Sequence, residues 1–304
     1  MGKIAFVFSG QGAQKTGMGQ SLSETYEEAR QIFEFADSIR PGTAAQCFEG
    51  PDEALRLTAN TQPCMLAVEL AAAAVLDRAG IKADMTAGFS LGEIAALTYA
   101  GAVDTETGFR LVCRRGQLMQ MDAEAEATTM AAVLKLSSET VKALAAEYGV
   151  YPVNFNCPGQ ISVSGKEEKM AAFSAAVKAA GGRAMPLKVQ GGFHSPYMSH
   201  AAESFRSDLN QVCFKQPRIP LYANLTAKPY NGEFVETLSA QICHPVLWED
   251  TIRNMMADGV DTFIELGPGK TLCGLIAKIS SEVRTFCVSD AASASAVIEE
   301  LGTC

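Results

Sequence analysis

The strongest chemical signal in this 304-residue chain is the pentapeptide Gly88-Phe89-Ser90-Leu91-Gly92. It has the G-x-S-x-G pattern, in which two glycines let the backbone turn sharply enough to lift a serine hydroxyl off a sheet. An apolar run at 85–89 precedes it and a helical pattern at 91–99 follows it, which is the strand–turn–helix setting that the pattern requires. The motif predicts that Ser90 is a nucleophile. The alternative is an ordinary glycine turn whose serine caps a helix.

A serine hydroxyl needs a neighbouring base to react, and the chain has three histidines, at 194, 200 and 244. His194 lies in a glycine-rich loop at 191–196, directly after a segment that we interpret as an inserted domain, where a cleft is expected. His200 falls on the following helical pattern and His244 precedes a proline, so we favour His194. No carboxylate stands out as a third partner, which weighs against a hydrolase triad. A carbonyl oxygen is another group that can orient an imidazole.

Two further glycine turns follow predicted strands. Gly10-Gln11-Gly12 follows the first strand, and sites in parallel sheets lie at the carboxyl ends of strands. Its N–H groups are therefore expected to share a crevice with those of the elbow and to form an oxyanion hole. The second turn, 267–271, reads GPGKT, but the first glycine of a phosphate-binding loop would fall on Ile264. We interpret it as a plain strand-to-helix turn.

The elements that must position these residues alternate between strand and helix. Strand patterns at 3–8 and 85–89 are separated by helical patterns, and we expect helices over 17–36, 63–78, 91–99 and 106–121, with Pro63 opening the second. Alternation of this kind predicts an α/β fold whose parallel sheet is covered on both faces.

The middle of the chain has a different pattern. Between residues 130 and 189 the order of expected elements is β-α-β-β-α-β, which is typical of a ferredoxin-like unit. We therefore divide the chain into a large α/β domain, residues 1–127 and 194–304, and a small inserted domain, residues 128–193. The α/β pattern resumes after the insertion.

Charge and composition exclude several classes of function. The net charge is −9 and the only basic pair is Arg114-Arg115, so no patch for nucleic acid is expected. The nine cysteines form no C-x-x-C and only three histidines exist, so we expect no metal site. Single cysteines in apolar stretches indicate buried thiols in a reducing compartment.

Nothing in the sequence indicates export or a membrane span. The N-terminal apolar run is too short for a signal sequence, and the longest apolar stretch, 64–76, is interrupted by Glu69. We therefore expect a cytoplasmic protein with no membrane partner. Asn224-Leu225-Thr226 matches a glycosylation sequon, which means little without a secretion signal.

Together these motifs resemble the malonyl-CoA:acyl carrier protein transacylases of type II fatty acid synthesis and the acyltransferase domains of polyketide synthases. The resemblance spans nearly the whole chain. It rests on Gly10–Gln14, Thr61–Pro63, Gly88–Glu93, Arg115-Gly116 with Met119-Gln120, Asn154–Asn156 with Pro158–Gln160, Gly191–Pro196, Gln241 ahead of Pro245-Val246, and Glu265 with Gly267–Lys270. It implies a hydrolase-like large domain with a ferredoxin-like insertion.

The resemblance also implies roles for individual residues. Ser90 would carry the acyl group as an ester, and His194 would be the general base. The N–H groups of Gln11 and Leu91 would form the oxyanion hole. Gln241 would hold the imidazole through a carbonyl oxygen, which would account for the missing carboxylate.

Selectivity for malonyl is implied by two positions. Arg115 would hold the free carboxylate of the malonyl group through paired hydrogen bonds, whereas its alternative is a residue on a helix surface. Phe193 before the histidine is also typical of malonyl-selective members.

Two positions depart from the family: Phe89 stands where His is usual and Ser9 where Pro is common. Phe89 replaces a polar contact with an apolar wall and leaves the elbow glycines intact.

The expected substrates and partners are malonyl-CoA and an acyl carrier protein, with no cofactor and no nucleic acid. A monomer is the expectation from the family, and a basic patch beside the cleft is expected for the carrier. Two other classes of protein remain open: a serine esterase or thioesterase, and a carrier-binding scaffold without turnover. The choice between fatty acid and polyketide synthesis also stays open.

Overall fold

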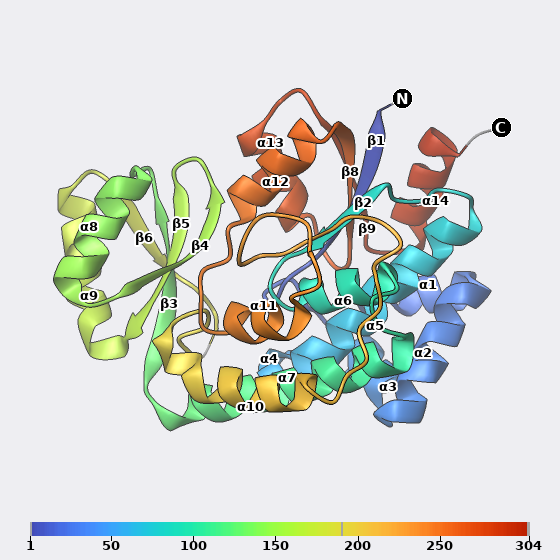
Figure 1. Cartoon of the computed structure of the whole chain (residues 1–304), viewed down its shortest axis with the longest axis horizontal. Helices are drawn as coiled ribbons and strands as arrows, with labels where there is room; N and C mark the ends of the chain where they lie inside the picture. Colours follow the sequence, from blue (N-terminus) through green and yellow to red (C-terminus); the bar gives the residue numbers. More distant parts are fainter. Residues whose placement is uncertain (1, 190, 303–304) are drawn as a thin grey trace.

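The computed structural model describes residues 2–189 and 191–302, which form two units, each built on its own sheet (Figure 1). The fold class is confirmed: a parallel sheet carries the larger unit and an antiparallel sheet carries the smaller one. The division at 128 and 193 stays a prediction.

The larger sheet has five strands in the order β7-β2-β1-β8-β9, all parallel. Their bounds are β1 Lys3–Phe8, β2 Met85–Gly88, β7 Leu221–Tyr222, β8 Val260–Leu266 and β9 Arg284–Val288. Because side chains alternate along a strand, Phe6 and Phe8 face one core while Ala5 and Val7 face the other. From Ile4 to Phe8 the central strand is therefore apolar, as a sheet covered on both faces requires.

Helices cover both faces of this sheet. Helices α12 (Trp248–Ala257) and α13 (Thr271–Ile279) supply the core on the Ala5 face. The core on the Phe6 face is supplied by α1 Gln20–Thr25, α2 Glu27–Ile39, α3 Thr43–Glu49, α4 Asp52–Arg56, α5 Thr58–Arg78, α6 Gly92–Tyr99, α7 Thr105–Ala125, α10 Ser199–Leu209, α11 Phe234–Gln241 and α14 Ala291–Leu301. A short 3-10 helix, Pro196–Met198, precedes α10.

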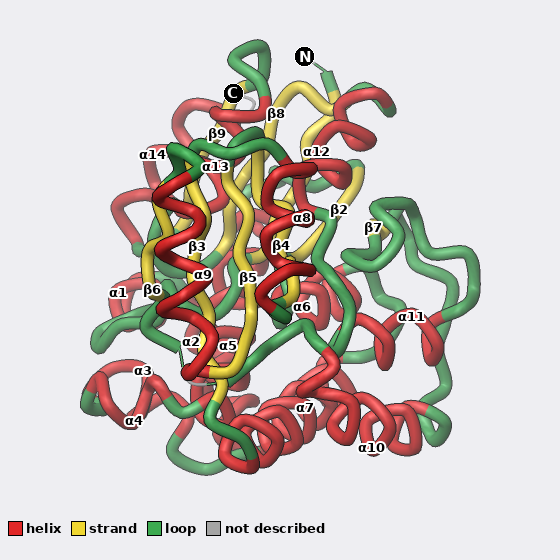
Figure 2. The backbone as a smooth tube through the Cα atoms, turned by 90° about the vertical axis from the view of Figure 1, so that its left-hand side faces the viewer, coloured by secondary structure: helices red, strands yellow, loops and turns green. Residues whose placement is uncertain are grey.

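The smaller sheet has the order β4-β5-β3-β6 and is antiparallel throughout. Its elements are β3 Thr128–Leu134, α8 Ser138–Tyr148, β4 Tyr151–Cys157, β5 Gln160–Lys166, α9 Glu167–Ala179 and β6 Arg183–Pro186. Figure 2 shows α8 and α9 against this sheet, with which they share a separate apolar core. The β-α-β-β-α-β order is the expected one.

Main-chain hydrogen bonds join the two units. The N–H of Val246, just before α12, donates to the Val153 carbonyl at 2.8 Å. The N–H of Phe155 donates back to the Val246 carbonyl at 2.9 Å. A loop of the larger unit thus pairs with β4 as a strand would.

Three expectations about elements were wrong or incomplete. Helix α5 begins at Thr58, five positions before Pro63, so the proline lies inside the helix rather than at its first turn. The single helix expected over 17–36 is two helices, because Tyr26 adopts extended backbone with φ −118°. The expected elements stopped at the helix from Thr271, so β9 and α14 were not anticipated.

Among the described residues, α5 alone is long and apolar enough to cross a membrane, and 83% of its apolar window is buried inside the fold. Eight cysteines are described, all as free thiols, and Cys304 lies outside the described residues. Cys213 is exposed, contrary to the expectation of buried thiols.

Candidate active site

Ser90 lies on the turn between β2 and α6, where its φ of 55° is in the left-handed region that a residue with a Cβ rarely adopts. The flanking glycines make this turn possible. A Cβ on Gly88 would lie 1.9 Å from main-chain atoms of Gly92, and one on Gly92 would lie 2.4 Å from the Phe8 carbonyl oxygen. The elbow thus packs directly against the neighbouring strand β1.

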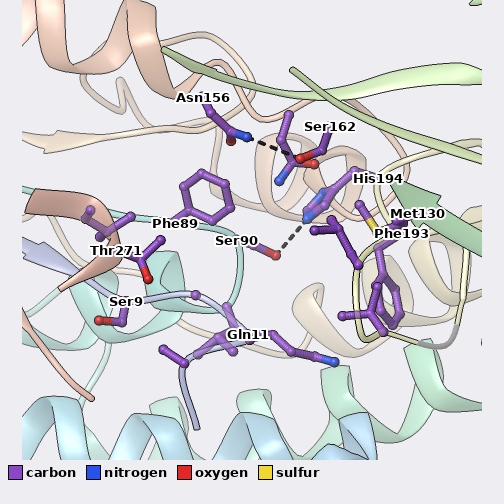
Figure 3. Close-up of a pocket in the computed structure, with 18 of the residues that line it drawn as sticks. Ser9, Gln11, Phe89, Ser90, Met130, Asn156, Ser162, Phe193, His194 and Thr271 are labelled. Atoms are coloured by element: carbon purple, nitrogen blue, oxygen red, sulfur yellow. Dashed lines mark hydrogen bonds between the residues drawn. The ribbon is translucent and has the colours of Figure 1, made fainter. Parts of the chain in front are cut away.

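His194 completes a hydrogen-bonded pair with the serine. Its Nε2 lies 2.7 Å from Ser90 Oγ (Figure 3). Its Nδ1 lies 2.8 Å from the main-chain oxygen of Gln241. Since a carbonyl only accepts, Nδ1 carries the proton and Nε2 is free to accept from the hydroxyl. Burial, with the nearby charge of Arg115, lowers the pKa of His194 to about 4. The imidazole is therefore a neutral acceptor at neutral pH.

Arg115 lies on the inner face of α7 with 1% of its surface exposed, so it is not the helix-surface residue of the alternative interpretation. Its guanidinium donates to Gln62 Oε1 at 2.9 Å, to Gln241 Oε1 at 2.8 Å and to Ser90 Oγ at 3.3 Å. Burial lowers the pKa of Arg115 to about 10, and the charge of Glu93 opposes that shift. A cation held only by neutral acceptors thus stands beside the serine.

Gln11 and Leu91 belong to the two turns at the carboxyl ends of β1 and β2. Gln11 follows β1 and Leu91 follows Ser90, and the two turns are tied by the Phe89 N–H, which donates to the Phe8 carbonyl at 2.9 Å. Within the described residues neither the Gln11 nor the Leu91 N–H donates to an acceptor. Both residues line the same cavity as Ser90. Two free N–H donors at this position can stabilise a developing negative charge by donating hydrogen bonds to it.

The cavity over Ser90 has a volume of about 260 Å³ and lies between the two units. Polar side chains of the small sheet, including Asn156 and Ser162, form one wall, and Figure 3 shows them across the cavity from Gln11. Phe89 and Leu272 lie on the side of the larger unit. A substrate in this cavity therefore contacts both units.

Three buried residues at the site were not anticipated as functional: Gln62, Glu93 and Asn224. The Glu93 carboxylate accepts from Gln241 Nε2 at 3.0 Å and from the Asn224 N–H at 3.2 Å, and it also bonds the Tyr230 hydroxyl. Burial raises the pKa of Glu93 to about 7, although its hydrogen bonds oppose the shift. The carboxylate sought as a triad partner thus orients the Gln241 amide rather than the imidazole. Its sequence signal is its place directly after the G-x-S-x-G motif, at the end of the Gly88–Glu93 segment of the family resemblance.

The remaining sequence candidates make hydrogen bonds with residues other than Ser90. His200 Nδ1 is 3.0 Å from Asp122 Oδ1 on α7, and His244 Nδ1 is 2.9 Å from the Ala240 carbonyl oxygen. In the GPGKT turn, Glu265 accepts the N–H groups of Leu272 and Cys273. A carboxylate therefore occupies the helix N-terminus that a phosphate-binding loop would offer to phosphate. Across residues 2–189 and 191–302, no three His, Cys, Asp or Glu side chains cluster as metal ligands would.

A comparison with protein families matches residues 5–298 to the model described as "Acyl transferase domain". The chain belongs to this acyl transferase family. A malonyl CoA-acyl carrier protein transacylase of Bacillus subtilis (strain 168) is 38% identical over 310 residues, which cover 99% of this chain and 98% of that protein.

Solved structures extend the comparison. The malonyl CoA-acyl carrier protein transacylase of Clostridium perfringens has a TM-score of 0.94 at 34% identity, covering 98% of this chain and 97% of that one. A malonyl-transacylase solved in complex with a type II polyketide synthase acyl-carrier protein has a TM-score of 0.94 at 34% identity, covering 98% and 99%. The acyl transferase fold is thus shared over its whole length.

The geometry of this acyl transferase suits attack on a carbonyl. A hydroxyl held 2.7 Å from a neutral imidazole can lose its proton as it attacks, and two free amides can receive the oxyanion. The guanidinium at 3.3 Å would meet a carboxylate on the acyl group.

Proposed function

We propose that this chain is an acyl-carrier-protein S-malonyltransferase, which moves a malonyl group from coenzyme A to the phosphopantetheine thiol of an acyl carrier protein. The observation that carries the proposal is the position of Ser90 Oγ, 2.7 Å from His194 Nε2 and 3.3 Å from the Arg115 guanidinium. One hydroxyl thus has both a base and a group that recognises carboxylates. The names of the relatives support the same reaction.

In the first half-reaction Ser90 takes the malonyl group. Its Oγ bonds to the thioester carbon while His194 Nε2 takes the hydroxyl proton. The N–H groups of Gln11 and Leu91 bind the oxyanion of the tetrahedral intermediate. The carbon–sulfur bond then breaks, and His194 returns the proton to the departing thiolate of coenzyme A.

In the second half-reaction the carrier takes the group. The carrier thiol gives its proton to His194 and attacks the ester carbon. The carbon–oxygen bond breaks and Ser90 recovers its proton from the imidazole. The Gln241 carbonyl holds Nδ1 throughout, so His194 keeps one orientation for both steps.

Arg115 gives the reaction its preference for malonyl. The malonyl carboxylate replaces weaker neutral acceptors on the guanidinium and forms charge-assisted bonds. An acetyl group would leave the buried cation without that partner, so acetyl-CoA is a poor substrate. Phe193 lines the same cavity and limits its width.

The partners follow from the reaction. They are malonyl-CoA and an acyl carrier protein, and the product serves fatty acid or polyketide synthesis alike. The chemistry needs no metal or cofactor. We assign the chain to the cytoplasm as a monomer without nucleic-acid or membrane partners, and we keep residues 128–193 as the inserted domain.

The test is the intact mass of the purified protein after mixing with malonyl-CoA alone. We expect a malonyl adduct that Ser90→Ala abolishes, that acetyl-CoA forms only weakly, and that an acyl carrier protein discharges. Rapid loss of the adduct without carrier would identify a thioesterase. Carrier binding without any adduct would identify a scaffold, and either result would overturn the proposal.

A further inference from the structure

The main chain of Ser90 is held by Asn224, a side chain that the proposed reaction does not use. Asn224 lies two residues after the end of β7, is fully buried, and lies beside the elbow because β7 pairs with β2. Its Oδ1 accepts the Ser90 N–H at 2.7 Å, and its Nδ2 donates to the Gly88 carbonyl at 2.6 Å. One carboxamide thus fixes both the nucleophile and the residue two positions before it.

This hold matters because Ser90 is in an unfavourable conformation. A φ of 55° is unfavourable for a serine. It persists only where contacts with the surrounding structure hold the backbone in that conformation. Relaxation of the turn would carry Oγ away from His194 Nε2. A small error in that distance has a large effect on rate, because the reacting atoms must start close to the geometry of attack.

The buried network around Asn224 orients it. The Asn224 N–H donates to Glu93 Oε2 at 3.2 Å, and Gln241 Nε2 lies within hydrogen-bonding distance of Asn224 Oδ1, at 3.3 Å. Gln241 Nε2 also donates to the Ser90 carbonyl at 2.8 Å. Both main-chain polar groups of Ser90 are therefore occupied by side chains, and the oxyanion is left to the N–H groups of the neighbouring turns.

We propose that Asn224 is a positioning residue, which keeps Ser90 in the left-handed conformation that aims its hydroxyl at His194. The inference rests on the proposed function, since it takes Ser90 as the nucleophile. It also accounts for the sequon at 224–226: the asparagine is buried with both amide atoms bonded, so it is a structural part of the elbow and not a glycan acceptor.

The experiment measures single-turnover acylation by malonyl-CoA in the full-length protein, with amplitude and rate obtained separately from intact mass. For Asn224→Ala we expect parental amplitude, a rate about 10²-fold lower and a malonyl-CoA concentration for half-maximal rate within about twofold of the parent. Asn224→Asp keeps the acceptor for the Ser90 N–H but loses the donor to Gly88. Its rate should therefore lie between that of the parent and that of Asn224→Ala. Thr226→Ala, in the same loop but exposed, is the matched control and keeps the parental rate.

Several results would overturn the inference. A parental rate in Asn224→Ala or Asn224→Asp would do so, as would equal rates in both variants. Reduced amplitude at the parental rate would show that Asn224 serves stability alone. If the parent itself forms no adduct, the proposed function fails, whereas a normal parent beside an unimpaired Asn224→Ala removes only the role of Asn224.

Discussion

At the scale of one residue, the buried charge of Arg115 makes the site suited to an anion. Its hydrogen-bond acceptors are the neutral oxygens of Gln62, Gln241 and Ser90. The charge of Glu93 opposes the lowering of the Arg115 pKa by burial, although Glu93 forms no salt bridge with Arg115 among the described residues. The guanidinium is therefore desolvated without a direct ion pair. In the proposed function a substrate carboxylate would supply that pair, and the charge of the substrate would be the basis of selection.

We predict that Arg115→Lys lowers kcat/KM for malonyl-CoA by about 10²-fold and changes acylation by acetyl-CoA much less, because an ammonium cannot make two parallel bonds to a carboxylate. Steady-state rates with both thioesters measure the ratio. The matched control is Arg114→Lys, one position away on the exposed face, where Arg114 pairs with Asp208 at 2.8 Å. Equal losses for both thioesters would contradict a carboxylate-binding role.

His194 predicts an unusual pH dependence. The base acts in its neutral form, and burial with the charge of Arg115 lowers its pKa from 6.5 to about 4. The kcat/KM for malonyl-CoA should therefore stay level as the pH falls from 8 to about 5 and decline only near pH 4. Rates measured within a short exposure, with folding monitored by circular dichroism, give the profile. A midpoint near 6.5 would show that the imidazole is solvated in the working enzyme.

The residues at the site differ in how well the sequence alone predicts their roles. Ser90 has a local motif, and His194 and Arg115 lie in short patterns that the family resemblance connects. Asn224 has no such signal, and Glu93 has only its place at the end of the Gly88–Glu93 segment. Their importance comes from contacts with Ser90 and Gln241 that only the folded sheet creates. Burial of a carboxylate cannot be read from its neighbours in a sequence.

At the scale of elements, α5 carries a carboxyl group into the core. Glu69 is fully buried, and neither of its side-chain oxygens has a hydrogen-bond partner among the described residues. Burial, and then the nearby charge of Glu265, raises the pKa of Glu69 well above its ordinary value. Glu69 therefore stays protonated in the folded protein over a pH range in which the same carboxyl group, with its lower pKa, is ionised in the unfolded chain.

We predict that Glu69→Gln stabilises the protein at pH 8 and has little effect near pH 4. The folded state binds the extra proton between the two pKa values, so parental stability falls as pH rises through that window, and the amide removes this cost. Tm of Glu69→Gln at pH 8 should therefore exceed that of the parent, and the difference should vanish near pH 4. Thermal unfolding at both pH values is the measurement. An equal effect at the two values would show that packing, not ionisation, is responsible.

The sequence predicts an element correctly where residues within that element, such as a capping side chain, determine where it begins. Asp104 caps α7 and Ser137 caps α8, as their positions before helical patterns suggest. The start of α5 was not predictable, because Pro63 is tolerated inside a helix whose packing against α7 and α2 outweighs one missing main-chain bond. The short strand β9 is mostly half-exposed, and its apolar run is only three residues long, Phe286 to Val288.

At the scale of the whole molecule, the cavity depends on how the small unit is held. The mutual bonds of Val246 with β4 are main-chain contacts that a side-chain change leaves in place. They fix the wall that carries Asn156 and Ser162 over Ser90. The walls of the cavity also keep water from the ester.

We predict that Val246→Pro, which removes the N–H that donates to Val153, speeds hydrolysis of malonyl-Ser90 roughly tenfold in the absence of carrier. Val246→Ala loses side-chain contacts but keeps the main-chain bond, and so serves as the control. The decay of the malonyl adduct, followed by intact mass, compares the two. Identical decay rates would show that this pairing does not control access of water.

The order in which the site residues occur along the chain has a consequence for biosynthesis. Ser90 contacts His194, Asn224 and Gln241 across 104, 134 and 151 positions of sequence. Long-range pairings of this kind form late in folding, and a nascent chain emerges from its N-terminus first. Ser90 therefore leaves the ribosome well before its base and before the side chains that hold its backbone. We therefore expect Ser90 to be unreactive towards malonyl-CoA until synthesis has passed Gln241.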